Sequence, residues 1–473
     1  MEEQPYTFGL VGLGVMGRNL VLNMADHGFP VVVFNRTASV ADAFMRDQAG
    51  ERPIRAAHSL KDLVAGLSRP RGIMLMINAG SAVDQVLDSL VPLLSEGDVL
   101  IDGGNSHFTD TDRRQKRLSP LGLAYLGVGI SGGEKGARLG PSIMPGGPAE
   151  AYEQVHRCFE AISAHVGGEP CVTYLGKSSA GHYVKMVHNG IEYALMQLIA
   201  EAYDLMKRGL GLDNDHLHEV FSEWSRSELK GYLIEITADI FSRDDEKTGL
   251  RLIDLILDEA EQTGTGMWMS QDALSLGVPV PTIDVAVTIR NLSAAWDERQ
   301  AMAKLLSGPQ AGVGMNADEY VPRLKNALYA ATVMAYAQGL AQLFRASAAY
   351  GYGLDLGAVA RIWRGGCIIR AALLEEFRAA FAESPRLDNL LKNSRIAEAV
   401  ITRVDDLRFI VGSAARSGIP AGAFMSALSH YDALRSSWLP ANLLQAQRDY
   451  FGAHRYKRVD EPGTDFHTEW ETA

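Results

Sequence analysis

The chain has 473 residues, too many for one hydrophobic core, so we expect two or three domains. Hydrophobic residues make up 47% of the chain and charged residues 22%, which is typical of a soluble globular enzyme and excludes a disordered or fibrous protein. The formal net charge of −12 argues against a nucleic-acid-binding protein. It also means that an anionic substrate would have to be drawn in by a local cluster of arginine and lysine.

Three scattered cysteines form neither a disulfide framework nor a metal-binding motif, as expected for a protein of the reducing cytoplasm. The acidic N-terminus has no signal-peptide pattern. The most apolar long segment, residues 327–343, contains two glutamines and is flanked by Lys325 and Arg345, so it predicts a buried helix and not a membrane span. We therefore expect a cytoplasmic protein with no membrane or nucleic-acid partner.

The first part of the chain alternates short apolar runs with amphipathic segments. The pattern predicts helices between strands, and the strands are expected at residues 7–14, 30–37, 72–78, 98–105, 123–131 and 170–176. Continuous apolar strands separated by helices indicate a parallel sheet that is covered by helices on both faces. We therefore predict an α/β domain over residues 1–177.

A glycine-rich loop follows the first predicted strand and opens a helix. Gly12, Gly14 and Gly17 have the spacing that allows a tight turn, close approach of the backbone to a pyrophosphate, and close packing of helix on strand. Together with Val15 and Met16 they form a candidate dinucleotide site. The alternative is a structural turn that is merely rich in glycine.

The end of the second predicted strand indicates which dinucleotide is bound. NAD-binding chains of this type have a carboxylate here for the ribose hydroxyls, whereas this chain has Asn35, Arg36 and Thr37. A cationic arginine with amide and hydroxyl neighbours suits a 2′-phosphate, so we expect NADP, with NAD as the less favoured cofactor. In the alternative interpretation Arg36 is an ordinary surface residue.

Two further glycine-rich segments, residues 102–108 and 129–147, follow later strands. Loops at the carboxyl ends of parallel strands line the ligand crevice of a doubly wound sheet. Amide, hydroxyl and backbone N–H donors for an oxygen-rich substrate are therefore expected from Asn105, Ser131, Gly132 and Gly133. Simple turn geometry is the alternative explanation for these glycines.

The most informative segment is residues 181–206. At about 100° per residue, Lys185, His188, Asn189 and Glu192 fall within one arc of roughly 100° on a helix. Apolar residues and a glycine fill the rest of the circumference, so we expect the helix to be buried around this stripe. Buried ionisable groups must be paired or must serve a ligand, which makes the stripe a candidate active site. A charged stripe that faces solvent or another helix is the alternative.

Helical patterns dominate residues 178–437, and we expect a large all-α domain there. Residues 438–473 contain one short helix followed by a polar tail with scattered aromatic residues. Such a tail must dock on another surface to be ordered, and a partner subunit is one candidate.

Eight motifs, distributed in order from the N-terminus to the tail, resemble those of one known family. They are GLGVMGRN, FNRT, DGGNS, SGGEKGAR, GPSIMPGG, KMVHNGIEY, WRGGCIIR and QRDYFGAH. Through them the chain resembles the decarboxylating 6-phosphogluconate dehydrogenases over essentially its whole length, and KMVHNGIEY with DGGNS is the most specific combination.

The resemblance implies a Rossmann-like domain that binds NADP, a large helical domain that forms a homodimer, and a tail that completes the partner's active site. Lys185 is then the general base that takes the proton of the C3 hydroxyl as hydride leaves for the nicotinamide. The resulting 3-keto acid loses CO₂ when protonated Lys185 polarises its carbonyl, and Glu192 protonates C1 of the enediol. No metal is required, because the ammonium group replaces a Lewis acid.

The same resemblance assigns residues to the rest of the sugar acid. The carboxylate and hydroxyls are held by Asn105, Ser131, Gly133, His188 and Asn189. Because Lys185 must be neutral when it acts, its pKa has to be lowered by burial or by nearby positive charge.

The chain departs from the family in the loop that holds the 6-phosphate of the substrate. Where the family has Gly-x-Gly-Lys-Trp-Thr, residues 264–269 carry Met267 and Met269 in place of the lysine and the threonine. One cation and one hydroxyl are thereby lost from the expected anion pocket. The other residues of that pocket match the family, and they are Tyr193, Arg290, Arg448 and, in the tail motif, His454.

The lost cation raises the question of a second substrate. A phosphate monoester carries about two negative charges whereas a sulfonate carries one, so a weakened pocket would favour 6-deoxy-6-sulfogluconate. Loss of one charge-assisted hydrogen bond would weaken phosphate binding by about 1.5–3 kcal/mol. Arg455, next to His454, is a candidate to restore the charge. Retained activity on the phosphate is the other interpretation.

Other classes of protein fit the sequence less well. A non-catalytic NADP-binding paralogue would be expected to lose Lys185 or Glu192, and both are present. A smaller β-hydroxyacid dehydrogenase would share the first domain and the lysine but lack the QRDYFGAH tail.

Overall fold

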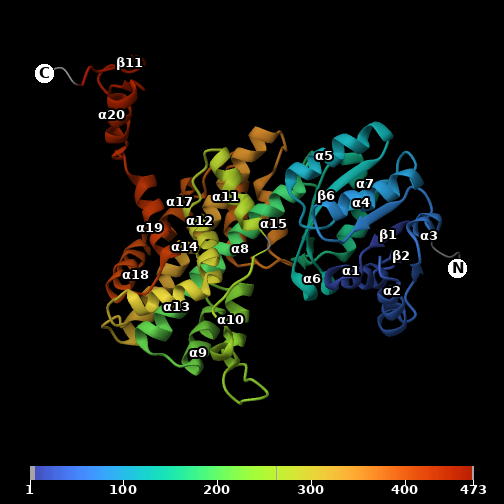
Figure 1. Cartoon of the computed structure of the whole chain (residues 1–473), viewed down its shortest axis with the longest axis horizontal. Helices are drawn as coiled ribbons and strands as arrows, with labels where there is room; N and C mark the ends of the chain where they lie inside the picture. The colour runs from blue at the N-terminus through green and yellow to red at the C-terminus, as the bar shows by residue number, and fades with distance from the viewer. Residues whose placement is uncertain (1–5, 263, 471–473) are drawn as a thin grey trace.

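The structure is a computed structural model that describes residues 6–262 and 264–470. A domain built on a mostly parallel sheet lies beside a larger helical body, and the C-terminal tail projects away from that body (Figure 1). This arrangement confirms the predicted fold class. Residues 1–5 of the predicted first domain and 471–473 of the predicted tail lie outside the described part.

Seven strands form the main sheet, and they are β1 (Phe8–Val11), β2 (Val31–Phe34), β3 (Ile54–Ala57), β4 (Gly72–Leu75), β5 (Val99–Asp102), β6 (Ala124–Ser131) and β7 (Ser142–Gly146). Their order in the sheet is β3-β2-β1-β4-β5-β6-β7. The chain runs outward from β1 to β3 and then returns to β4 on the other side of β1. The loops that follow β1 and β4 therefore flank a topological switch point, where open α/β sheets bind ligands.

The helices of this domain are α1 (Val15–Asp26), α2 (Ala38–Phe44), α3 (Leu60–Ala65), α4 (Ser81–Leu90), α5 (Phe108–Leu118), α6 (Gly133–Leu139) and α7 (Ala149–Ile162). They cover both faces of the sheet. Because successive strand residues point to opposite faces, each strand contributes side chains to two cores. Leu10 of β1 belongs to the apolar core beneath α1 and α7, whereas Val11 belongs to the core beneath α3 and α4. The predicted two-sided burial is confirmed.

The sequence analysis missed two strands of the sheet, β3 and β7, and wrongly predicted that all strands are parallel. β3 was not predicted, because only its first and last residues are buried and it has no continuous apolar run. Residues 129–147, expected as a glycine-rich loop, contain the end of β6, the helix α6 and the strand β7. β7 pairs antiparallel with β6 at the edge of the sheet, where Pro145 is tolerated.

The strand expected at residues 170–176 is also wrong. The chain forms a two-residue hairpin there, from β8 (His165–Val166) and β9 (Glu169–Pro170), followed by a single bridge from Val172 to Ile143. The apolar side chains that suggested a strand, such as Cys171 and Leu175, are buried against neighbouring elements instead.

The helical body is built from α8 (Ala180–Asp204), α9 (Asn214–Trp224), α10 (Tyr232–Ser242), α11 (Thr265–Ser275), α12 (Pro281–Ala294), α13 (Trp296–Leu305), α14 (Ala317–Tyr350), α15 (Leu356–Trp363), α16 (Leu373–Glu383), α17 (Ser394–Ile401), α18 (Val404–Ser417) and α19 (Gly422–Arg435). The two longest helices, α8 and α14, meet in its core. A Cβ atom added to Gly339 of α14 would lie 2.5 Å from Ile191 of α8, so the glycine allows this close contact. Within the described residues, no helix is both long and apolar enough to cross a bilayer.

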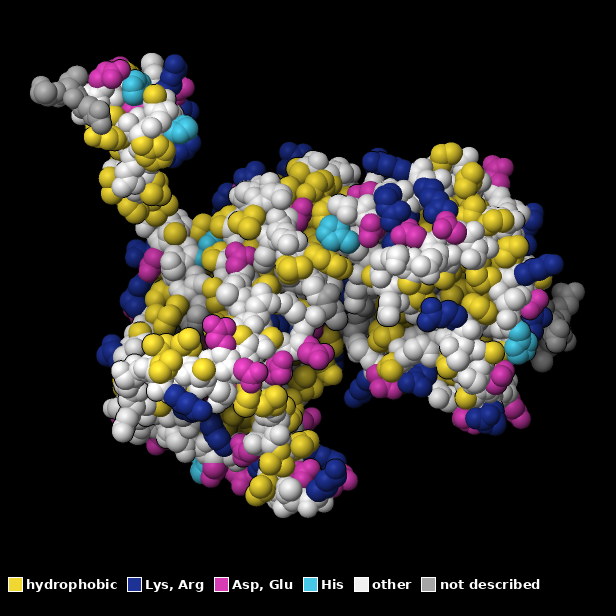
Figure 2. All heavy atoms as spheres, viewed as in Figure 1, with side chains coloured by type: hydrophobic (Ala, Val, Ile, Leu, Met, Phe, Trp, Pro, Cys, Tyr) yellow, Lys and Arg dark blue, Asp and Glu magenta, His cyan; other side chains and the backbone are white. Residues whose placement is uncertain are grey.

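The tail consists of α20 (Ala441–Gly452) and the short hairpin of β10 (Tyr456–Lys457) and β11 (Asp465–Phe466). Hydrophobic side chains are exposed along α20 and the segment just before it (Figure 2), among them Leu439, Leu443, Leu444 and Phe451. Inside the tail, buried Asp449 accepts hydrogen bonds from the backbone N–H of Thr468 and the indole N–H of Trp470. The tail is therefore held together by its own contacts while its helix presents apolar side chains to the outside.

Candidate active site

The helix α8 docks on the sheet through glycines. A Cβ atom on Gly181, in the first turn of α8, would collide with the carbonyl oxygens of Gly127 and Met144. A Cβ atom on Gly129 of β6 would come within 2.9 Å of the Lys185 Cγ atom. Because none of these glycines carries a side chain, α8 lies directly on β6 and β7, and Lys185 is placed at the carboxyl-terminal half of β6.

The predicted stripe is buried. Lys185, His188 and Asn189 are at most 8% exposed, and the side chain of Glu192 is 22% exposed. Lys185, Asn189 and Glu192 line a cavity of about 410 Å³, and Tyr193 lies at its edge. The alternative of a stripe facing solvent is excluded by this burial.

His188 lies behind the cavity and connects its two walls. Its Nε2 atom is 3.3 Å from the hydroxyl oxygen of Ser131, and its Nδ1 atom is 3.2 Å from the side-chain oxygen of Asn189. Nδ1 also lies 3.7 Å from a carboxylate oxygen of Glu192. Burial lowers the pKa of His188 well below its usual value, so the ring is neutral and can orient its neighbours without adding charge.

The two ionisable groups of the stripe have opposite pKa shifts. Burial lowers the pKa of Lys185, partly opposed by the nearby Glu192 carboxylate. Burial also raises the pKa of Glu192, partly opposed by Lys185 and Arg290. Both shifts favour the uncharged forms, a lysine that can accept a proton and a carboxylic acid that can donate one.

The wall opposite the stripe comes from two loops of the sheet domain. These loops contribute Asn105, Ser131, Gly132 and Gly133, as the sequence predicted. Gly132 has φ of +110°, and a Cβ atom there would lie 2.5 Å from the carbonyl oxygen of Gly366. Only glycine fits this close contact, which places the loop after β6 against the helical body.

A second cavity, of about 620 Å³, lies at the switch point of the sheet. It is lined by Gly14 and the first residues of α1, Val15, Met16 and Gly17, with Asn78 and Gly80 after β4 and Gly104 and Asn105 after β5. A Cβ atom on Gly12 would collide with Met76, and one on Gly17 would collide with Gly12. A Cβ atom on Gly14, by contrast, would have no neighbour within 4 Å, so the N-terminus of α1 faces open space. These features suit a pyrophosphate at the helix N-terminus.

The two cavities are adjacent. They share four lining residues, namely Met16, Asn105, Ile130 and Thr265. A dinucleotide in the larger cavity and a small acid in the smaller one would therefore be in contact. Met16 and Asn105 stand at the junction, which extends the cofactor role predicted for Met16 to the substrate side.

The three predicted cofactor-binding residues at the end of β2 lie in different environments. The Asn35 side chain accepts a hydrogen bond from the Leu13 N–H at 3.0 Å and donates one to the carbonyl of Thr37 at 3.0 Å. Arg36 and Thr37 are exposed and do not line the cavity described above. Asn35 thus braces the glycine loop, whereas Arg36 is exposed to solvent.

The expected anion pocket is only partly assembled within one chain. The guanidinium of Arg290 lies 3.4 Å from the centre of the Tyr193 ring, and both residues line the smaller cavity. Met267 is 38% exposed and does not line this cavity. Arg448 and His454 lie exposed on the projecting tail, away from the cavity of their own chain.

The expectation that Met269 lies in the anion pocket is wrong. Its side chain is fully buried, and its sulfur occupies the space where a Cβ atom of Gly190 would be. Gln342 of α14 donates a hydrogen bond to its carbonyl at 3.1 Å. The substitution is therefore a core contact between α8 and α11, which sequence spacing alone does not distinguish from a pocket position.

Several lining residues were missed. Thr265 and Trp268 belong to the glycine-rich segment at 264–269 and line the larger cavity, so their motif could have indicated them. Ile368, in the WRGGCIIR motif, lines the smaller cavity. Glu261 and Gln262 also line it, but nothing in their local sequence marks them.

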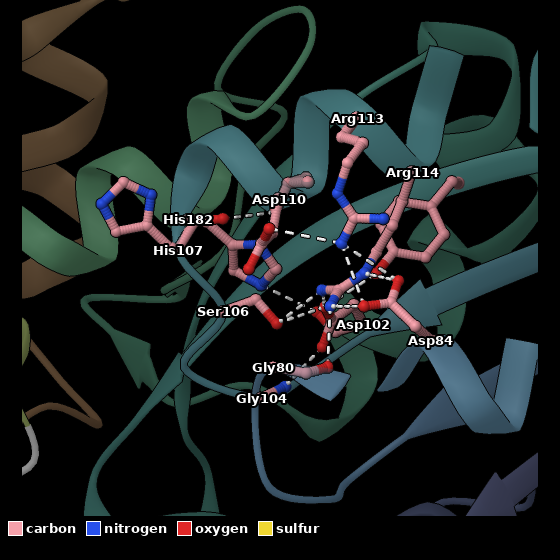
Figure 3. Close-up of polar contacts among 12 residues, drawn as sticks. Gly80, Asp84, Asp102, Gly104, Ser106, His107, Asp110, Arg113, Arg114 and His182 are labelled. Atoms are coloured by element: carbon pink, nitrogen blue, oxygen red, sulfur yellow. Dashed lines mark hydrogen bonds and ion pairs between the residues drawn. The ribbon is translucent and has the colours of Figure 1, made fainter. Parts of the chain in front are cut away.

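A buried polar network supports the loop that carries Asn105 (Figure 3). The carboxylate of Asp102 accepts hydrogen bonds from Ser106 at 2.6 Å and Tyr125 at 2.7 Å. The Asp102 carbonyl bonds to the ring of His182, one turn before Lys185 on α8, at 3.0 Å. No group of three or more histidine, cysteine, aspartate or glutamate side chains in the described part of the chain is arranged to hold a metal ion.

The comparisons with known proteins cover the whole of this architecture. The family model for the NAD binding domain of 6-phosphogluconate dehydrogenase matches residues 7–176, and that for the 6-phosphogluconate dehydrogenase C-terminal domain matches residues 181–470. An NADP(+)-dependent, decarboxylating 6-phosphogluconate dehydrogenase of Bacillus subtilis is 51% identical, and a decarboxylating one of Escherichia coli K12 is 49% identical, each over 98% of both chains.

A solved structure agrees with these matches. It is that of Plasmodium falciparum 6-phosphogluconate dehydrogenase, described in its apo form and in complexes with NADP+ and with 6-phosphogluconate. It superposes with a TM-score of 0.93 at 41% identity and covers 98% of this chain and 100% of that one. Full-length sequence similarity and a shared fold together show that the chain belongs to the 6-phosphogluconate dehydrogenase family.

Proposed function

We propose that the chain is an NADP-dependent dehydrogenase that oxidises and decarboxylates 6-phosphogluconate to ribulose 5-phosphate. One observation carries the proposal: Lys185 and Glu192, two turns apart on α8, face a single cavity that is adjacent to the dinucleotide cleft. The named activity of the relatives and the NADP+ and 6-phosphogluconate complexes of the related structure support the same reaction.

Lys185 begins the reaction as general base. Burial lowers its pKa, which favours the neutral amine that removes the proton of the C3 hydroxyl. NADP, when bound in the adjacent cleft, accepts the hydride that leaves C3. The proton stays on Lys185, whose ammonium then faces the new C3 carbonyl.

Lys185 and Glu192 complete the reaction from the same side of the cavity. The ammonium of Lys185 polarises the C3 carbonyl and donates its proton to the carbonyl oxygen, so the carbon–carbon bond to the carboxylate breaks and its electrons form an enediol as CO₂ leaves. Burial raises the pKa of Glu192, which favours the protonated acid. This acid donates its proton to the enediol carbon that becomes C1 of the ketopentose. Proton transfer there, with return of the enediol hydroxyl proton to Lys185, gives the ketopentose, and the Glu192 carboxylate regains a proton from the Lys185 ammonium or from solvent.

A homodimer with exchanged tails accounts for the incomplete anion pocket. Tyr193 and Arg290 are in place within one chain, whereas Arg448 and His454 lie on a tail that projects from the body and exposes apolar side chains. We infer that the tail of each subunit docks on the other and brings Arg448 and His454 to the phosphate.

We also place the enzyme in the cytoplasm, which agrees with three buried free cysteines.

The sulfonate remains the competing substrate. Arg290 and Lys185 are the cations among the described lining residues of the cavity, and Met267, which does not line it, adds no charge to the pocket within one chain. Measurement of kcat/KM for 6-phosphogluconate and 6-deoxy-6-sulfogluconate decides between them. We expect the phosphate to be the better substrate, and a faster sulfonate reaction would reverse this assignment.

The catalytic assignment is tested by Lys185→Ala. NADPH formation should fall by at least about 10²-fold, the usual contribution of a general base, while NADP binding is retained. Lys177→Ala is the matched control, because Lys177 is an exposed lysine immediately before α8. Turnover that survives in Lys185→Ala would show that another group is the base. A wild-type protein that binds NADP but turns over neither acid would instead favour the non-catalytic paralogue.

A further inference from the structure

Arg114 of α5 has no exposed surface and uses its whole guanidinium in hydrogen bonds (Figure 3). Nε and one terminal nitrogen donate to Asp84 at 2.9 and 3.1 Å, and that same terminal nitrogen donates to the Gly80 carbonyl at 2.9 Å. The other terminal nitrogen donates to Ser106 at 3.2 Å and Asp102 at 3.4 Å. These five bonds equal the donor capacity of an arginine side chain.

The partners of Arg114 come from two different walls of the dinucleotide cleft. Gly80 ends the turn after β4 and Asp84 lies in the first turn of α4, whereas Asp102 is the last residue of β5 and Ser106 lies in the turn between β5 and α5. Residues on both turns line the larger cavity. The guanidinium therefore lies behind the cleft and joins its two walls, and a planar fork of donors fixes their separation in a way that a single ammonium does not.

The same network reaches the helix of the catalytic base. His182 Nε2 donates to the Asp102 carbonyl, and the Thr111 hydroxyl lies 2.7 Å from His182 Nδ1. With Nε2 as the donor, Nδ1 accepts from Thr111, and burial lowers the pKa of the ring so that it stays neutral. His182 precedes Lys185 by one helical turn, so the wall of the cleft and the base share one rigid connection.

Electrostatics makes this connection costly to disturb. Asp102 is fully buried, and its carboxylate is balanced by Arg114 together with the Ser106 and Tyr125 hydroxyls. A buried carboxylate that loses its cation must be protonated or must move towards water. Movement of Asp102 would displace Gly104, whose N–H donates to it at 3.1 Å, and with it the neighbouring Asn105.

We propose that Arg114 is a positioning residue for the reaction: it holds the two walls of the cofactor cleft at the separation NADP requires and, through Asp102 and His182, aligns that cleft with Lys185. The proposal rests on the proposed function for the identity of the cofactor and for the role of Lys185 as base. Its direct consequence is that the affinity for NADP depends on a side chain that does not line the cleft.

The test uses the full-length protein with three substitutions. Arg114→Lys keeps the charge but loses the fork, and Ser106→Ala removes one hydroxyl from the network without a large cavity. Arg113→Lys is the matched control, since Arg113 also binds Asp84 but is 51% exposed, and in the described residues its hydrogen bonds go only to Asp84 and Asp110.

The readouts are the NADP dissociation constant, measured by titration without turnover, and the melting temperature of each variant. Arg114→Lys should raise the dissociation constant by about ten-fold or more, the size of one lost charge-assisted hydrogen bond, and Ser106→Ala by a smaller factor. Arg113→Lys should stay within about two-fold of the wild type.

A purely structural role would lower the melting temperature without changing the affinity of the folded protein. If Arg114→Lys does not fold, Ser106→Ala decides. A folded Arg114→Lys or Ser106→Ala protein that binds NADP as tightly as the wild type overturns the proposal. Failure of the wild type to oxidise 6-phosphogluconate would overturn the proposed function instead, because the affinity for NADP is measured independently.

Discussion

The side-chain oxygen of Asn35 accepts a hydrogen bond from the backbone N–H of Leu13 at 3.0 Å, which ties the end of β2 to the glycine loop after β1. Asn35 therefore shapes the loop. The next residue, Arg36, is exposed. We therefore predict that discrimination between NADP and NAD depends on Arg36.

Arg36→Ala should change the preference for the cofactor. Loss of one cation facing a 2′-phosphate is expected to raise the NADP dissociation constant by about ten- to one-hundred-fold, while NAD affinity changes little. Both constants are measured by titration. Arg46→Ala is the control, because Arg46 is also exposed and pairs only with its neighbour Asp47 among the described ion pairs. Equal weakening of NADP and NAD would contradict this role.

The position of the base depends on a missing side chain. Gly129→Ala would push a methyl group against Lys185 and shift α8 away from β6. Since a displacement of about 1 Å at a reacting group costs about 10²-fold, we expect kcat to fall by that order while NADP binding is retained. Gly308→Ala is the control, because an added Cβ there has no neighbour within 4 Å. A kcat within a few-fold of the wild type would show that α8 tolerates the extra carbon.

The sequence predicted the parts of this molecule that local pattern determines. Apolar runs indicated the central strands, and a 3.6-residue period placed Lys185 and Glu192 on one face of a buried helix. β3 was missed because a strand at the edge of a sheet is buried at only some positions. The role of Arg114 was missed because its partners are far apart in the chain and are brought together only by the sheet order.

The error over Met269 has a similar origin. Both methionines of the 264–269 segment looked like replacements in an anion pocket, yet Met269 packs against Gly190 and Met267 is exposed. Which face of α11 points to the cavity is decided by contact with α8, and sequence spacing within the motif carries no information on it.

Glu201 should make stability depend on pH. Its carboxylate, on α8, accepts hydrogen bonds from the backbone N–H groups of Ala423 and Phe424 at the start of α19, at 2.8 and 3.0 Å. Burial nevertheless raises the pKa of Glu201 to about 7. Because this folded-state pKa lies above the unfolded value of about 4.3, the contribution to stability is greatest below about pH 4 and is lost progressively as pH rises to about 7.

Glu201→Gln removes this titration. The free energy of unfolding is measured with denaturant at pH 5 and at pH 8. The difference between these two values should be smaller in Glu201→Gln than in the wild type, by up to about 3 kcal/mol. Glu219→Gln is the control, since Glu219 is an exposed glutamate on α9. The same pH dependence in Glu201→Gln and wild type would show that Glu201 is ionised throughout this range.

The conformation of the tail should depend on the carboxylate of Asp449. Buried Asp449 accepts hydrogen bonds from the N–H groups of Arg455 and Thr468 at 2.8 and 3.1 Å and from Trp470 at 2.9 Å. These bonds hold a turn in which Ala453 and Arg455 both have positive φ. An uncompensated turn of this kind is strained, so the carboxylate stabilises the conformation that presents Arg448 and His454.

Asp449→Asn replaces one acceptor oxygen by a donor and should loosen this turn. We expect faster proteolysis within residues 438–470 and a rise of about ten-fold in the KM for 6-phosphogluconate, with the NADP dissociation constant unchanged, because in the proposed dimer Arg448 and His454 serve the phosphate and not the cofactor. Asp460→Asn is the control, since Asp460 is an exposed carboxylate of the same tail that pairs with Arg458. A normal KM in an Asp449→Asn protein with a protease-sensitive tail would mean that the tail does not contribute to the phosphate site, and Tyr193 with Arg290 would then have to bind the anion without it.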